Sequence, residues 1–74
     1  MPIKKSINIL GHKTSISIEK EFWKILKIFS EEENRSISSI INEIDTTKPQ
    51  NKSLSSSIRL YILRKLINKA SIKI

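Results

Sequence analysis

The sequence predicts a mainly helical fold with a short β-strand near the N-terminus. Residues 13–18 (KTSISI) alternate between polar and β-branched side chains, and a period of two is typical of a strand with one buried face. Further along the chain, apolar residues recur at i, i+3, i+4 and i+7, which is the spacing of one helix face. With only 74 residues, the chain is long enough for one domain, and oligomerisation is a common way to stabilise so small a core.

The predicted strand has a polar face and an apolar face. Lys13, Ser15 and Ser17 alternate with Thr14, Ile16 and Ile18, so the first three point away from the core. A lone strand leaves its backbone N–H and C=O groups without partners. Because no second strong strand follows in the sequence, we expect the same strand of a second copy of the chain to be the partner.

The residues before this strand give a weaker pattern. Segment 1–12 alternates loosely between apolar and polar residues, which predicts a short strand or an extended arm. Gly11 and His12 read as a turn, since glycine adopts positive φ at little cost.

Three helices follow in the predicted order. The first begins near Glu19 and ends near Glu33, Asn34 then suits a C-cap, and Ser36 suits the N-cap of the second helix. Segment 13–45 thus forms a strand–helix–turn–helix unit. Segment 46–53 is polar, contains Pro49 and reads as a linker, and segment 54–69 resumes helical spacing with apolar residues on two sides.

The net charge of +7 is unevenly distributed. Residues 1–18 and 46–74 contain no acidic residue, whereas residues 19–45 hold all seven. Basic ends indicate a polyanionic partner, most often nucleic acid. Two other interpretations are plain solubility and binding of the basic, two-sided helix 54–69 to an anionic membrane.

The residue inventory argues against an enzyme and against a metal site. The chain has no cysteine, one histidine (His12) and one glycine, so it lacks thiolate chemistry, a zinc ligand set and glycine-rich phosphate loops. We therefore expect no cofactor. No apolar run suits a membrane span or a signal peptide, and we expect a cytoplasmic protein.

These residues resemble the ribbon-helix-helix family of DNA-binding proteins. The segment GHKTSISIEKEFW (11–23) is similar to a bacterial subgroup with the pattern G-H-x-T-S-x-x-L-E-x-x-F-W, and LSSSIR (54–59) resembles its later Leu-Ser-Ser segment. The segment NRSIS (34–38) is similar to the inter-helix turn of the family. Two departures are Ile18 in place of leucine and Asn34 where glycine is frequent.

The resemblance implies a homodimer whose strands pair into an intermolecular antiparallel β-ribbon that enters the major groove of double-stranded DNA. Carried over by position, Lys13, Ser15 and Ser17 would contact bases. Phosphate contacts would come from the start of the second helix, and the basic N-terminus adds two candidates; the set is Ser36, Ile37, Ser38, Lys4 and Lys5. The dimer core would comprise Ile16, Ile18, Phe22, Leu26, Phe29, Ile37, Ile40, Ile41 and Ile44.

We therefore expect a transcriptional regulator, with repression as the expected mode. The alternative is an antitoxin-like or other protein-interaction module that uses helix 54–69 to hold a protein partner. An adjacent small toxin-like reading frame would favour that alternative.

Overall fold

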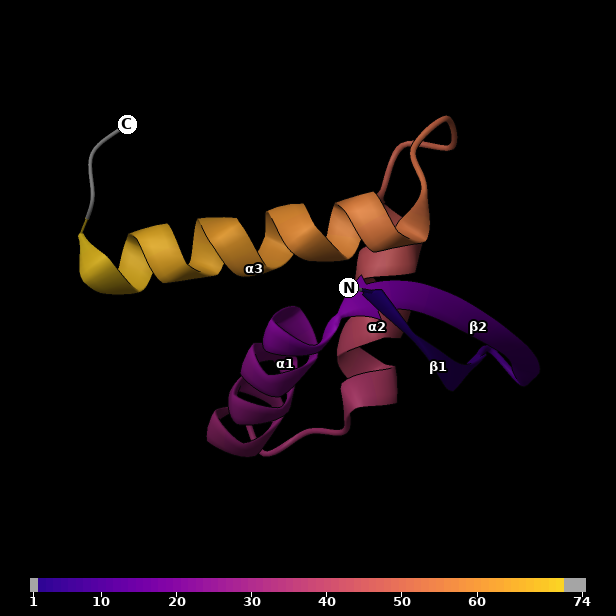
Figure 1. Ribbon diagram of the computed structural model, residues 1–74, viewed down its shortest axis with the longest axis horizontal. Helices are drawn as coiled ribbons and strands as arrows, with labels where there is room; N and C mark the ends of the chain where they lie inside the picture. The colour runs from indigo at the N-terminus through magenta and orange to yellow at the C-terminus, as the bar shows by residue number, and fades with distance from the viewer. Residues whose placement is uncertain (1, 72–74) are drawn as a thin grey trace.

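The computed structural model describes residues 2–71, which form a β-hairpin followed by three helices (Figure 1). The elements are β1 (Pro2–Ile9), β2 (His12–Glu19), α1 (Lys20–Glu32), α2 (Ile37–Thr47) and α3 (Leu54–Ala70). This arrangement confirms the predicted mainly helical fold with an N-terminal strand and an additional C-terminal helix.

The partner of β2 lies in the same chain. β1 pairs with β2 antiparallel, in a register that runs from Pro2 opposite Glu19 to Ile9 opposite His12. This corrects the expectation that β2 finds its partner only in a second copy. The weak alternation of residues 1–12 is enough to form this second strand, because Ile7 extends the apolar face of Ile16 across the hairpin. The other edge of β2 has no strand beside it within residues 2–71.

The hairpin closes through a two-residue loop, Leu10 and Gly11, one position earlier than predicted. Both residues have positive φ, 50° and 83°, as a type I′ turn requires. His12 is therefore the first residue of β2 rather than part of the turn. Leucine in the left-handed region is strained, and its side chain lies in solvent with 74% of its surface exposed.

The core is closed by side chains from all five elements of one chain. Seven of the nine residues predicted for a dimer core are buried within the single chain, while Phe22 and Ile37 are half-buried and pack against them. Three further buried residues lie outside that predicted set: Ile7 from β1, and Ile58 and Ile62 from α3. The buried set is Ile7, Ile16, Ile18, Leu26, Phe29, Ile40, Ile41, Ile44, Ile58 and Ile62.

The turn between α1 and α2 is specified by local hydrogen bonds. Asn34 has φ 55°, and the Asn34 and Arg35 N–H groups donate to the carbonyls of Glu31 and Ser30, which together form a Schellman C-cap. The Ser36 hydroxyl then accepts from the Ser39 N–H at 3.0 Å and caps α2. Both capping residues fulfil their predicted roles.

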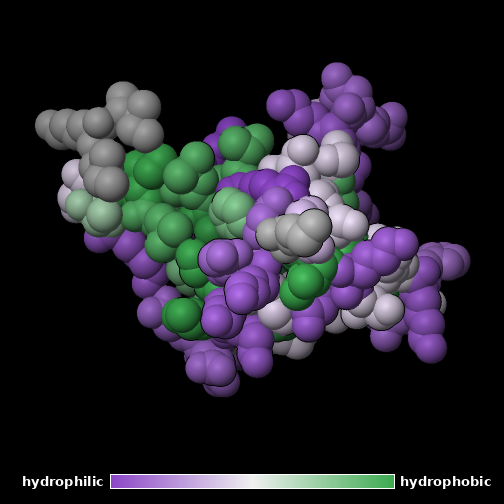
Figure 2. Space-filling model, in the orientation of Figure 1, coloured by the Kyte–Doolittle hydropathy of each residue, from purple (hydrophilic) through white to green (hydrophobic). Residues whose placement is uncertain are grey.

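Helix α3 docks on the core with one face and leaves the opposite face in solvent. Ile58 and Ile62 are fully buried, whereas Leu60, Leu63 and Leu66 are exposed. Figure 2 shows hydrophobic side chains gathered over α3 on the left of the molecule. Of these three, Leu63 is the most exposed at 51%, and Leu60 and Leu66 are each 37% exposed.

The turn supplies a stability prediction. Replacing Leu10 with Asn should stabilise the protein by about 0.5–1 kcal/mol, because asparagine tolerates the left-handed conformation that leucine resists. Little packing is lost, since the leucine is mostly exposed. Thermal or urea unfolding at one fixed protein concentration measures the change.

The control for this prediction is the neighbouring residue. Gly11→Ala adds a Cβ that meets nothing within 4 Å, so only its positive φ opposes the substitution, and we expect a loss of about 1 kcal/mol. A Leu10→Asn protein no more stable than the unmodified protein would mean that the turn is not strained as described.

Candidate nucleic-acid interface

Polar side chains cover most of the outer side of the hairpin. Paired residues share a face of the sheet, and four cross-strand pairs lie on this side. Pro2–Glu19 is at the open end, where Glu19 is paired with Arg59, and the other three pairs are polar. They are Lys4 opposite Ser17, Ser6 opposite Ser15, and Asn8 opposite Lys13. All six side chains are exposed, and the set contains two cations and no acid. We call these six residues the outer face.

The structure brings together most of the residues predicted from this region, and it separates one. Lys13, Ser15, Ser17 and Lys4 lie on the outer face. Lys5 lies on the inner face, opposite Ile16, and its Nζ is 5.1 Å from the centre of the Trp23 ring. That distance is typical of a cation–π contact, and this contact links β1 of the hairpin to α1.

Sequence reasoning missed Ser6 and Asn8 on the outer face. The alternation of Ile3, Ile7 and Ile9 with polar residues pointed to these positions, but an extended arm with no known partner strand has no register. Only the pairing of β1 with β2 sets Ser6 directly opposite Ser15.

The chemistry of the outer face suits hydrogen bonding to polar edges. Serine hydroxyls donate and accept, the Asn8 amide does both at fixed positions, and lysine ammonium groups donate. These small side chains on a two-stranded element match the size of the DNA major groove, and an Asn or Lys there favours adenine or guanine respectively.

The second predicted set lies at the start of α2. Ser36 is the N-cap and is exposed, whereas Ile37 and Ser38 are half-buried in the first turn. The Ser36 hydroxyl satisfies only the Ser39 N–H, so the N–H groups of Ile37 and Ser38 have no intrahelical acceptor. Such amides at the positive end of a helix dipole favour an anion.

Arg35 fixes the position of this helix start, a role that the sequence analysis missed. Its guanidinium donates to the Ser39 carbonyl at 3.0 Å and to the carboxylates of Glu33 at 3.4 Å and Glu43 at 3.2 Å. The ends of α1 and α2 are thereby tied together through one side chain.

An ion pair ties the far end of the hairpin to α3. The Arg59 guanidinium donates from Nε to Glu19 Oε1 at 2.7 Å and from Nη2 to Oε2 at 3.0 Å, a two-point geometry that is stronger than a single contact. The hydrogen bond from Arg59 holds the pKa of the Glu19 carboxyl below its usual range.

Two searches of the described residues bear on other classes of site. Within residues 2–71, no three His, Asp or Glu side chains gather closely enough to hold a metal ion. None of the described helices is both long and apolar enough to cross a membrane.

Comparison with known proteins gives one match. A family model described as a ribbon-helix-helix domain matches residues 2–66, so the match includes β1 and most of α3 as well as the segment 13–45. No curated protein and no solved structure matches the chain.

The ion pair between Glu19 and Arg59 predicts a pH dependence of stability. The pKa of Glu19 is lowered in the folded state, so its contribution is fully present above the unfolded pKa of about 4.3. It is lost as the pH falls through the lower folded pKa. The free energy of unfolding should therefore exceed that of Glu19→Gln at pH 6, and the difference should shrink below about pH 4.

The matched control is Glu21→Gln, which removes an exposed carboxylate from the first turn of α1. Glu21 forms no ion pair within the described part of the chain. A difference for Glu19→Gln that persists unchanged at low pH would argue against the ion pair as its source.

Proposed function

Because the chain belongs to the ribbon-helix-helix family, a family of DNA-binding regulators, we propose that it binds specific double-stranded DNA sequences as a homodimer. The observation that carries this proposal is the outer face of the hairpin, with six exposed polar side chains, two of them cationic and none acidic. The hairpin enters the major groove with this face toward the base edges.

The role that we propose for each side chain follows from its position in the fold. Lys13, Ser15 and Ser17 on β2 read bases, and Ser6 and Asn8 of β1 lie beside them on the outer face. Base contacts give sequence preference, whereas phosphate contacts fix the position on the duplex. Lys4 and the amides at Ser36, Ile37 and Ser38 take the phosphate role, and Lys5 is left out because it packs over Trp23.

The proposed dimer forms along the free edge of β2. In a hairpin with a two-residue loop, hydrogen-bonded pairs alternate from the loop outward, so the backbone N–H and C=O of Lys13, Ser15 and Ser17 point away from β1. An exposed edge of this kind readily pairs with another strand. Two copies joined here give the order β1–β2–β2–β1.

Comparing the width of this four-stranded sheet with that of the major groove indicates where each strand lies. Strands lie about 4.8 Å apart, so the two central β2 strands fit a major groove about 12 Å wide. The two β1 strands then lie near the groove walls, where Lys4 reaches phosphates. This fits the prediction of an intermolecular ribbon, with β1 added on each side.

The regulatory reading follows from specific DNA binding. A dimer seated in the major groove of a promoter hinders polymerase, so repression is the proposed mode and the cytoplasm the proposed location. The membrane alternative has no support in the described helices beyond the exposed apolar side of α3.

One observation favours a second candidate function. The exposed stripe of Leu60, Leu63 and Leu66 on α3 suits a protein partner, as in the antitoxin-like alternative. Co-expression with the product of an adjacent small reading frame tests it. A stable complex that Leu63→Glu abolishes would support this candidate, and the absence of any complex would count against it.

The base-reading role predicts a selective loss of affinity. Replacing Ser15 with Ala should weaken binding to the preferred site by about 1–3 kcal/mol, the usual cost of one bad base contact. Binding to random duplex should hardly change, because phosphate neutralisation supplies that affinity. Selection from a random DNA library identifies the preferred site, and salt titrations on both duplexes give the two affinities.

Ser56→Ala is the control, since it removes an exposed hydroxyl from α3 rather than from the hairpin. It should leave both affinities unchanged. Equal losses on specific and random duplexes for Ser15→Ala would remove β2 as the reading element.

The dimer edge predicts opposite results for two proline variants. Ser15→Pro removes an N–H on the free edge of β2 and should give monomers, because proline cannot donate to a strand ladder. Ser6→Pro makes the same change at the outer edge of β1, directly across the hairpin, and should leave the dimer intact. Analytical ultracentrifugation at micromolar concentration measures both.

The unmodified protein should show a thermal midpoint that rises with concentration, since association and folding are linked. Dimers of Ser15→Pro together with monomers of Ser6→Pro would assign the interface to β1. A monomeric unmodified protein would refute the dimer.

A further inference from the structure

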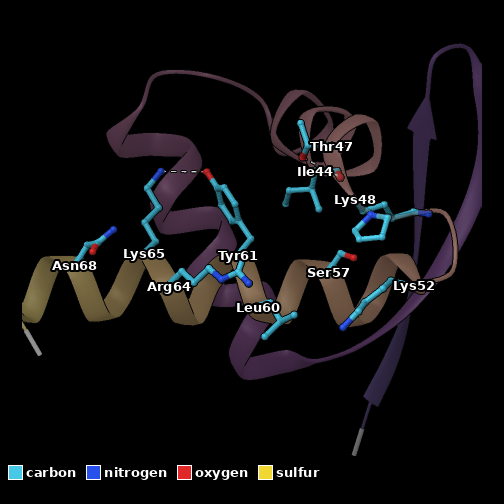
Figure 3. A pocket seen from close by; sticks show the side chains of 11 residues that line it. Ile44, Thr47, Lys48, Lys52, Ser57, Leu60, Tyr61, Arg64, Lys65 and Asn68 are labelled. Atoms are coloured by element: carbon cyan, nitrogen blue, oxygen red, sulfur yellow. Dashed lines mark hydrogen bonds between the residues drawn. The ribbon is translucent and has the colours of Figure 1, made fainter. Parts of the chain in front are cut away.

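A groove opens between α3, the end of α2 and the linker that joins them (Figure 3). Its volume is about 420 Å³, within the range of small-molecule sites. Eleven residues line it, and none comes from the hairpin. The lining is Ile44, Thr47, Lys48, Pro49, Lys52, Ser57, Leu60, Tyr61, Arg64, Lys65 and Asn68.

The charge of the groove has one sign. Four of the lining residues are cations and none is acidic. Lys65 is already engaged, since it pairs with Glu33 and donates to the Tyr61 hydroxyl at 3.1 Å. Lys48, Lys52 and Arg64 make no ion pair within residues 2–71, so three of the lining cations have no ion-pair partner there.

The lining also has an apolar part, formed by Ile44, Pro49, Leu60 and the ring of Tyr61, and three neutral polar residues, Thr47, Ser57 and Asn68. Leu60 and Tyr61 project from α3, and Ile44 lies on α2 across from them (Figure 3). Pro49 adds the ring of the linker. Burial of Tyr61 also raises the pKa of its hydroxyl; a tyrosine hydroxyl is neutral at physiological pH with or without this change and can donate a hydrogen bond.

We propose that this groove binds a small amphiphilic acid, an apolar body that carries a phosphate, carboxylate or sulfonate group. The apolar body contacts Leu60, Tyr61 and Ile44, and the acidic group pairs with Arg64 and the linker lysines. An apolar lining with a few placed polar groups is the usual composition of such sites.

Two other occupants fit less well. DNA phosphates would match the cations but would leave the exposed Leu60 without an apolar partner. A second copy of α3 would match the apolar residues, but residues 46–74 contain seven cations and no acid, so two such helices repel each other.

The test is an isothermal calorimetric titration of the 74-residue protein with octyl phosphate below its critical micelle concentration. Octanol and octyltrimethylammonium share the chain and differ in charge. We expect saturable binding of octyl phosphate, weaker binding of octanol and the weakest binding of octyltrimethylammonium. No saturable binding of octyl phosphate, or equal binding of octyltrimethylammonium, would overturn the proposal.

Substitutions locate the site. Lys48→Gln and Arg64→Gln should each weaken octyl phosphate binding about threefold to fivefold, the size of one partly exposed ion pair, and should leave octanol binding unchanged. Lys27→Gln, an equal charge change on the exposed side of α1, should have no effect. An equal loss in Lys27→Gln would mean that only net charge matters and would overturn the assignment.

A lipid surface carries the same chemistry, and a second arm separates it from a dissolved ligand. Vesicles of phosphatidylglycerol replace octyl phosphate in a sedimentation assay. At physiological salt, we expect Arg64→Gln to leave the amount of vesicle-bound protein unchanged. Binding of vesicles that Arg64→Gln abolishes, without binding of dissolved octyl phosphate, would identify a membrane-surface site instead.

Discussion

The register of the β-hairpin is the constraint on which the rest of the structure depends. Because side chains alternate across a strand, a slip of one residue would move every apolar residue of that strand to the solvent face. The two-residue loop at Leu10 and Gly11 fixes the pairing, and with it the burial of Ile7, Ile16 and Ile18. The same register collects lysine, serine and asparagine on the outer face.

The helices give this hairpin a rigid base. Ile18 and Leu26 are fully buried, as is Ile58 of α3, and Arg59 forms an ion pair with Glu19 at the end of β2. The Asn34 turn and the Ser36 cap fix where α2 begins. The hairpin and the helix start that are proposed to meet DNA are therefore parts of one closed core, as a precisely positioned site requires.

Sequence patterns predicted the helices, their caps and the polar side of β2 because each rests on local chemistry. The Ser36 hydroxyl caps α2 by accepting from the Ser39 N–H, three positions on, and Ile40, Ile41 and Ile44 follow one helical stripe. The pairing of β1 with β2 was missed, because a weak alternation can indicate a strand but does not identify the strand that pairs with it. The roles of Arg59 and Ile62 also escaped, because each depends on how α3 docks against elements far away in the sequence.

The proposal that the outer face reads DNA is tested most directly by following backbone amide signals of ¹⁵N-labelled protein during titration with the selected duplex. The account expects the largest shifts at Lys13, Ser15 and Ser17, with smaller changes at Ser6, Asn8 and the start of α2. On random duplex the shifts along the hairpin should be small. Shifts confined to Lys48, Lys52 and Arg64, with the hairpin unchanged on the selected duplex, would contradict it.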